Sequence, residues 1–223
     1  MSTSKLNRKP LLALPAIVFL LSGDLAGQPP QISGTLLFEN EHVRVRRVTI
    51  PAGNKSEMHA HANPSLEIFL TEDHVRETLS DGTVHVWRSK PNQVAWTGAN
   101  THRVENLMKT PVELISIEFK SLPAAAAKAP GSASASEFEN EWIKVTRAKL
   151  APREKGAMHS HPMYIGVFLS DYAKLRMYSA DGSSRDVEGK RGDTSWRAPV
   201  THRVENLLDV PFEALDINLK SPK

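Results

Sequence analysis

Histidine is the residue type whose spacing in this chain most clearly predicts chemistry, because its imidazole nitrogen is a common metal ligand. Six of the nine histidines occur in two copies of one pattern, offset by 100 residues. Each copy has a His-x-His pair and, farther along, a third histidine in the segment Thr-His-Arg-Val-Glu-Asn-Leu. The first copy contributes His59, His61 and His102, and the second contributes His159, His161 and His202.

The spacing of each pair places both imidazoles on one side of a β-strand, since residues i and i+2 project to the same face. A third histidine from another strand would complete a set of three nitrogen ligands on a divalent ion such as iron, manganese or zinc. Such a set leaves coordination positions open for water or substrate, which is typical of catalytic metal sites. The pattern therefore predicts metal binding in at least one half of the chain.

The alternative is that these histidines belong to the core or the surface of a duplicated fold. A single His-x-His pair would fit that alternative, but two pairs with matching downstream histidines are hard to explain without a metal. The other three histidines have no counterpart at the same offset: His42, His74 and His85.

The amino-acid composition of the chain restricts the possible metal ligands. The chain of 223 residues has no cysteine, which excludes disulfides and thiolate metal sites. Imidazole, carboxylate and water remain as possible metal ligands. The length suits one large or two small domains.

The N-terminal segment 1–27 is expected to be a secretory signal peptide. Lys5, Arg8 and Lys9 precede the apolar run 11–21, which is too short for a usual membrane span. The expected location is periplasmic or secreted, with an uncleaved N-terminal anchor as the alternative. Removing 1–27 removes three basic residues and one acidic residue, so the formal charge falls from +3 to +1. A nearly neutral body gives no support for nucleic-acid binding. No segment after residue 30 is apolar enough to span a membrane.

The remaining chain alternates short strand-like runs with turn signals. In the first half the expected strands are 43–50, 66–70, 78–80, 83–87, 93–96, 102–107 and 112–119. Asp81-Gly82 and Asp181-Gly182 predict tight hairpin turns with a positive φ. The second half repeats the order, and the Ala-, Pro- and Ser-rich segment between the halves predicts a linker. We therefore expect domains at 34–121 and 137–223, a linker at 122–136, and one small all-β barrel or sandwich in each half, packed together.

The motifs resemble those of the cupin superfamily, and the duplication resembles a two-domain bicupin. The first cupin motif, Gly-x5-His-x-His-x3-4-Glu-x6-Gly, matches Gly53, His59 and His61, with Glu67 one or two residues late for its glutamate. The second motif ends in His-x3-Asn, which matches His102 with Asn106 and His202 with Asn206; Gly192 is a candidate for its opening glycine. The resemblance covers nearly all of residues 35–221. The sequence is also similar to those of small bacterial cupins with a His-x-x-Glu-Asn-Leu segment.

This resemblance implies two tandem jelly-roll (double-stranded β-helix) barrels and one divalent metal in each. The first site would use three histidines plus Glu67, although an exposed strand carboxylate is an equal alternative for Glu67. The second half has Gly166 at the corresponding position and would offer three histidines without a carboxylate.

Other residues of the repeats carry weaker expectations. Asn106 and Asn206 share the histidine face and are expected to fix the barrel end by hydrogen bonds, with support of a metal ligand as the alternative. Glu105 and Glu205 are expected to face away and to pair with a nearby basic residue, in particular Arg103 and Arg203. For Trp96, Trp196 and Tyr164, packing is expected rather than contact with substrate.

Two functions follow from the resemblance and stay open. One is an oxygenase- or decarboxylase-type enzyme acting on a small, oxygen-rich compound, in particular a carboxylate, because three neutral ligands leave the charge on the metal. Oxalate decarboxylase is also a bicupin, but it is longer and its acid-bearing lid motif has no match here. The other is a non-catalytic extracytoplasmic protein that binds a small ligand or a metal. Catalytic residues and oligomeric state are not readable, and a homo-oligomer is compatible with either function.

Overall fold

The computed structural model describes residues 31–123 and 136–221, and the regular structure within these ranges consists of β-strands. The expected signal segment 1–27 and most of the expected linker 122–136 lie outside the described residues. No helix in the described part of the chain has the length and apolarity needed to cross a membrane.

Each half contains nine strands in the same order. The strands of the first half are β1 (Ser33–Glu39), β2 (Val43–Ile50), β3 (His59–His61), β4 (Ser65–Phe69), β5 (Asp73–Leu79), β6 (Val84–Ser89), β7 (Val94–Thr97), β8 (Asn100–Asn106) and β9 (Val112–Phe119). Those of the second half are β10 (Ser136–Glu139), β11 (Ile143–Leu150), β12 (His159–His161), β13 (Tyr164–Phe168), β14 (Tyr172–Ser179), β15 (Ser184–Lys190), β16 (Thr194–Arg197), β17 (Val200–Asn206) and β18 (Phe212–Leu219).

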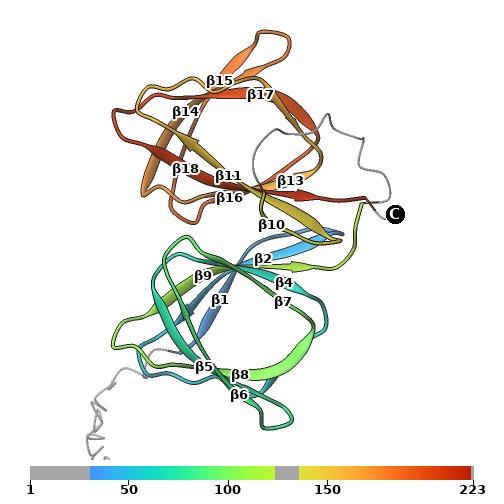
Figure 1. Cartoon of the computed structure of the whole chain (residues 1–223), viewed down its shortest axis with the longest axis vertical. Helices are drawn as coiled ribbons and strands as arrows, with labels where there is room; N and C mark the ends of the chain where they lie inside the picture. The colour runs from blue at the N-terminus through green and yellow to red at the C-terminus, as the bar shows by residue number, and fades with distance from the viewer. Residues whose placement is uncertain (1–30, 124–135, 222–223) are drawn as a thin grey trace, which may run out of the picture. The chain divides into compact units, whose positions relative to one another are not determined.

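The strands of each half form one five-stranded and one four-stranded antiparallel sheet. In the first half the sheet orders are β1-β2-β9-β4-β7 and β3-β8-β5-β6, and in the second they are β10-β11-β18-β13-β16 and β12-β17-β14-β15. The two sheets of each half close into a barrel (Figure 1). The prediction of an all-β chain of two tandem barrels is confirmed.

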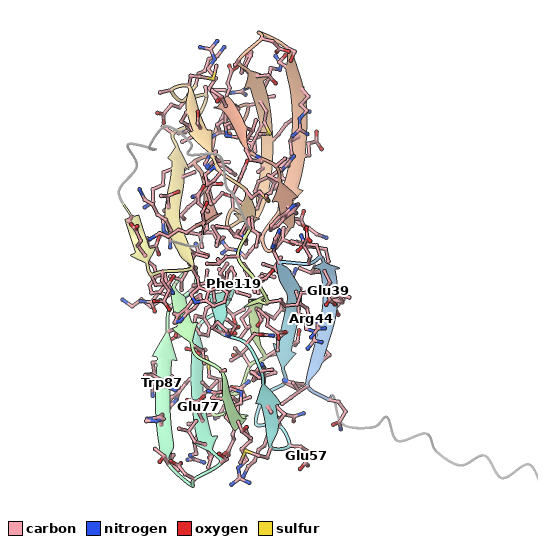
Figure 2. The ribbon with its side chains drawn as sticks, turned by 90° about the vertical axis from the view of Figure 1, so that its right-hand side faces the viewer. Glu39, Arg44, Glu57, Glu77, Trp87 and Phe119 are labelled. Atoms are coloured by element: carbon pink, nitrogen blue, oxygen red, sulfur yellow. The ribbon has the colours of Figure 1, made fainter. Side chains whose placement is uncertain are left out.

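Alternation along the five-stranded sheets divides their apolar residues between two cores. On β9, Val112 and Leu114 pack inside the first barrel, while Ile115, Ile117 and Phe119 belong to a cluster that contains residues of both barrels. Phe119 is labelled in Figure 2. Each fully buried Ile or Phe side chain contributes roughly 1.5–3 kcal/mol relative to exposure. The shared cluster therefore explains how two small barrels reach stability together, as expected from their size.

Hydrogen bonds and a close backbone approach also join the barrels. The guanidinium groups of Arg147 and Arg191 donate to the carbonyl and the side-chain oxygen of Asn92, at 2.7 and 2.6 Å. Asn92 has φ 69°, and its counterpart Gly192 has φ 82°. A Cβ on Gly192 would lie 2.8 Å from the side chain of Leu70, so this glycine permits the close approach of the barrels.

The expected turns and tryptophan roles are confirmed. Gly82 and Gly182 both have φ 86°, as the Asp-Gly turns require. Trp96 and Trp196 pack against the shared core rather than inside a barrel.

Candidate metal centres

The second barrel brings His159, His161 and His202 together, as the sequence predicted. His159 and His161 project from β12, and the β12–β17 pairing places His202 directly opposite His159. Their ring centroids lie 4.7–5.2 Å apart, and one nitrogen from each ring falls within 4.8 Å of the others. The Nε2 atoms of His159 and His202 are 3.1 Å apart. Two nitrogens bound to one ion at about 2.1 Å would be roughly 3.0–3.4 Å apart, so this spacing fits a shared metal.

Hydrogen bonds at Nδ1 orient the rings of His159 and His161 and leave the lone pair of each ring on Nε2. His159 Nδ1 donates to the carbonyl of Ala157 at 2.9 Å. His161 Nδ1 lies 2.9 Å from Asn218 Oδ1, and the Asn218 amide nitrogen donates to two backbone carbonyls, so the oxygen must face the ring. The Nε2 atom of His161 then carries a lone pair and is buried without a hydrogen-bond partner among the described residues. An orphaned acceptor of this kind fits a metal ligand.

Burial favours the neutral form of two histidines of the second triad, His161 and His202. Desolvation, followed by His159, His161 and the cations Arg197 and Arg185, lowers the pKa of His202 to about 3. Desolvation also lowers the pKa of His161. Neutral imidazole is the form that binds metal, so both rings are ready ligands at physiological pH.

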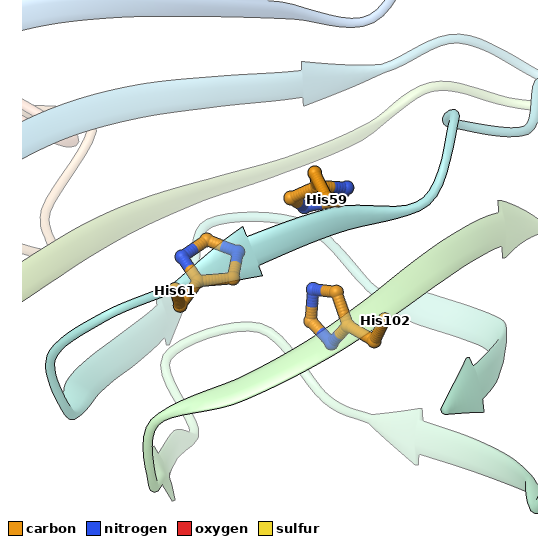
Figure 3. A group of neighbouring side chains, drawn as sticks. All are labelled: His59, His61 and His102. Carbon is orange, nitrogen blue, oxygen red and sulfur yellow. The ribbon is translucent and has the colours of Figure 1, made fainter. Parts of the chain in front are cut away.

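The first barrel holds the equivalent triad, drawn in Figure 3. His102 lies opposite His59 across the β3–β8 pairing, and ring centroids are 4.8–5.0 Å apart. His59 Nδ1 donates to the carbonyl of Glu57 at 2.9 Å, and His102 Nδ1 lies 2.6 Å from Glu77 Oε1. Burial lowers the pKa of His61. This triad is more open than the second: His59 is exposed, whereas His161 and His202 are only 3% and 5% exposed.

Glu67 lies on β4 with a different set of partners. Its Oε1 accepts hydrogen bonds from the hydroxyls of Ser65 and Ser116, at 2.7 and 3.0 Å. Among the described residues, the group of clustered ligand atoms in this barrel comprises the three histidines. Burial raises the pKa of Glu67 to about 7, and the two serines oppose that rise. Its role as a fourth ligand stays a prediction.

A cavity of about 650 Å³ occupies the second barrel and adds Arg197 and Asp216, which the sequence had not indicated. All three histidines line it, together with Tyr164, Arg197 and Asp216. Desolvation raises the pKa of Asp216 to about 6, and nearby His159 opposes that rise. Tyr164 is 4% exposed and stacks on His161 with centroids 4.3 Å apart, so it packs as expected and lines the cavity too. Strand parity could have drawn attention to Asp216 and Asn218, which share one face of β18.

The asparagines of the repeated segment clasp the ends of the barrels. Asn106 donates to the carbonyls of Ile50, Pro51 and Thr110 and accepts from the amide of Met108. Asn206 repeats the arrangement with Ala151, Val210 and Leu208. The prediction that these side chains fix the barrel ends is confirmed.

Glu105 and Glu205 pair with nearby basic residues, as predicted, but the expected partners Arg103 and Arg203 were wrong. Glu105 pairs with Arg76, which lies directly opposite on β5, rather than with Arg103. Glu205 accepts from the Tyr178 hydroxyl and lies 3.7 Å from Lys155, while Arg203 sits over the Tyr178 ring. For Glu105 the cross-strand neighbour decides the pairing, because Arg76 faces the same side of the sheet. The equivalent neighbour of Glu205, Arg176, pairs with Asp186 instead.

Comparison with known proteins supports the architecture. No protein-family model and no curated protein sequence matches the chain. Among solved structures, the oxalate decarboxylase of Lactobacillus farciminis in a formate complex is 12% identical, covers 82% of this chain and 78% of its own, and has a TM-score of 0.57. A Bacillus subtilis oxalate decarboxylase studied for its Mn(II) centres is 15% identical over 82% and 70%, with a TM-score of 0.56.

A third structure is similar over more of its own length. AerE from Microcystis aeruginosa is 13% identical and covers 86% of this chain and 98% of its own, with a TM-score of 0.58. At such identities the likeness concerns the fold. Together with the cupin motif spacing and the two histidine triads, it leads to one conclusion: the chain has the fold of a bicupin of the cupin superfamily, with one triad in each of its two tandem barrels.

Proposed function

We propose that this bicupin is a metal-dependent enzyme that acts on a small carboxylate compound in its second barrel, by decarboxylase- or oxygenase-type chemistry. The observation that carries the proposal is one cavity lined by His159, His161, His202 and the guanidinium of Arg197. A metal-ligand set and a carboxylate-binding group thus border the same space. A volume of about 650 Å³ is within the range of small-molecule sites.

The three histidines would hold a divalent ion, with manganese, iron and zinc as candidates. When bound, the ion would supply Lewis-acid or oxygen-activating chemistry. Because all three ligands are neutral, the ion would keep its full positive charge and favour an anionic ligand. The buried, unpartnered Nε2 of His161 supports this assignment.

Arg197 is suited to bind the substrate carboxylate. Its Nε donates to Ser195 Oγ at 3.0 Å, and Ser195 is its hydrogen-bond partner in the described structure. The two terminal nitrogens therefore remain free for a bidentate contact with a carboxylate. Leu175 and Phe212, which also line the cavity, offer an apolar wall for the rest of the molecule.

Two acidic residues line this cavity, and Asp216, which is less exposed than Glu154, could exchange a proton with substrate. A pKa of about 6 is closer to neutrality than that of an ordinary aspartate. Loss of CO2 from a carboxylate leaves a carbon that must be protonated, and an acid within the cavity could supply that proton. The aspartate would then be reprotonated from solvent.

The neighbours and the N-terminal segment suggest starting conditions. Two similar structures are oxalate decarboxylases, and one of them is described with Mn(II) centres. Oxalate and Mn²⁺ therefore come first among the substrates and metals to be tried. We also propose an extracytoplasmic location, based on the signal-like segment 1–27, which cell fractionation with a leader-deleted control would test.

The test is an activity screen of the purified protein. The chelated and the Mn²⁺-, Fe²⁺- or Zn²⁺-loaded forms would be assayed for CO2 release and O2 consumption on a panel of small mono- and dicarboxylates. We expect turnover that disappears on chelation and returns with one metal. Carboxylate binding without turnover across the panel would instead indicate the non-catalytic binding protein. Turnover that survives complete metal removal would contradict the proposal.

A further inference from the structure

The two triads differ in what holds their third histidine. In the first barrel, the side chains of His102 and Glu77 are each 12% exposed, and His102 Nδ1 lies 2.6 Å from Glu77 Oε1. The indole nitrogen of Trp87 donates to the other oxygen, Oε2, at 3.1 Å. Figure 2 labels Glu77 and Trp87 on the neighbouring strands β5 and β6. Both carboxylate oxygens are thus engaged, which fixes Glu77 against the imidazole.

The second barrel lacks this arrangement. The strand registers place Met177 where the first barrel has Glu77, and Val187 where it has Trp87. Within the part of the chain that the structure describes, His202 Nδ1 is consequently buried without a hydrogen-bond partner, in whichever tautomer the ring adopts.

A carboxylate that accepts a hydrogen bond from a metal-binding histidine increases the affinity of the site for the metal. By accepting a hydrogen bond from Nδ1–H, Glu77 leaves the lone pair of His102 on Nε2 and makes that nitrogen a more basic ligand. Both oxygens of the Glu77 side chain face donors in this arrangement, His102 on one side and Trp87 on the other, as suits a carboxylate. Its negative charge also compensates the charge of a bound cation.

The wider charge distribution points the same way. At the first triad, the Glu77 carboxylate contacts His102 directly, and Glu118 acts on His61 although it also pairs with Arg44. At the second triad, the cations Arg197 and Arg185 act on His202 instead, and the nearby buried carboxyl group is that of Asp216. The first site therefore favours a cation more strongly, whereas the second leaves the metal less compensated.

We propose that the two triads are differentiated metal sites, in which Glu77 positions His102 and makes the first barrel the tighter site. The second barrel holds its ion less tightly and leaves it more positive, which suits a site that must receive an anionic ligand. This inference rests on the proposed metal binding and adds an order of affinity and a positioning residue to it.

The test is an equilibrium titration of the chelated full-length protein with Co²⁺, in competition with a chromophoric chelator. His159→Ala isolates the first site and His59→Ala isolates the second. Glu77→Gln and Met177→Glu are then added in the matching backgrounds. Glu105→Gln is the control, because Glu105 lies on the same strand as His102 but pairs with Arg76. Melting temperatures verify that each variant is folded.

We expect the first site to bind Co²⁺ about 10–100-fold more tightly than the second, which is the usual effect of such a carboxylate. Glu77→Gln should remove most of that advantage, Met177→Glu should tighten the second site, and Glu105→Gln should leave the first unchanged. Equal affinities, the reverse order, or an unaffected Glu77→Gln would overturn the inference while leaving metal binding intact. An absence of Co²⁺ binding in both barrels would instead contradict the proposed function itself.

Discussion

Glu67 and Asp216 occupy opposite members of the same cross-strand pair in the two barrels. Glu67 on β4 is paired with Ser116 on β9, and Asp216 on β18 is paired with Gly166 on β13. Each barrel therefore keeps one inward carboxylate at this level of the sheet, opposite a small residue. The carboxyl group that the cupin motif predicts on one strand is supplied from the neighbouring strand in the second barrel.

Glu67 should make the stability of the protein depend on pH. Its pKa is about 7 in the folded state, against 4.5 for an ordinary glutamate. The folded state thus holds the proton more tightly than the unfolded state. Its stabilising contribution is complete below pH 4.5 and is lost as the pH rises through about 7, with a magnitude on the order of 3 kcal/mol.

Glu67→Gln should remove this dependence, because a neutral amide can still accept from Ser65 and Ser116. Urea unfolding of the metal-free protein would show a variant that gains stability relative to the wild type at pH 8 but not at pH 4.5. Glu72→Gln, at an exposed position, is the control. Equal pH profiles for Glu67→Gln and wild type would contradict the prediction.

Asp216→Asn should separate proton transfer from metal binding. If Asp216 supplies a proton in the second barrel, the amide should lower kcat by about 100-fold or more. The metal content should stay at the wild-type level, because the three histidines are unchanged. Mass spectrometry of the metal and steady-state kinetics measure the two quantities, and an unaltered kcat would rule out the proposed role of Asp216.

Arg197→Met should weaken carboxylate binding. Losing a charge-assisted bidentate contact removes about 1.5–3 kcal/mol, which corresponds to a rise in KM of roughly 10–100-fold. Arg176→Gln is the matched control, because Arg176 pairs with Asp186 and is 42% exposed. A KM that changes equally in both variants would indicate a general electrostatic effect instead of a specific contact.

Asn206→Ala should affect stability rather than metal binding. The buried amide makes three hydrogen bonds to the backbone of the chain segments at the barrel end. Leaving their partners unsatisfied should cost about 2–4 kcal/mol of unfolding free energy. Chemical denaturation measures that loss, and the metal affinity of the folded variant should match the wild type. A selective loss of metal from a stable variant would favour support of a ligand instead.

The sequence was sufficient for features that depend on local spacing or on the repeat. Strand parity predicted that His159 and His161 share a face, and the duplication identified His202 as their partner. The clasp by Asn206 was expected from the strand face that it shares with His202, and the packing of Trp96 and Trp196 from the usual role of aromatic residues in strands.

Features that depend on strand register could not be read in this way. Asp216 resembles any polar residue of an alternating strand until β18 is placed beside β13, opposite Gly166. The pairing of Glu105 with Arg76 and the contact of Glu77 with His102 likewise require the order β8-β5-β6. A hairpin prediction gives β5 and β6 as neighbours but does not say which strand lies on the other side of β5.

The most direct test of the account is the metal content of the purified protein and of its His59→Ala and His159→Ala variants, measured by mass spectrometry after loading with Mn²⁺, Fe²⁺ or Zn²⁺. Two triads of the observed geometry predict two ions in the wild type and the loss of one in each variant. One ion that is lost only in His159→Ala would restrict the site to the second barrel and contradict a metal in the first. No ion under any loading condition would contradict metal binding altogether and leave a bicupin fold with a binding or a structural role.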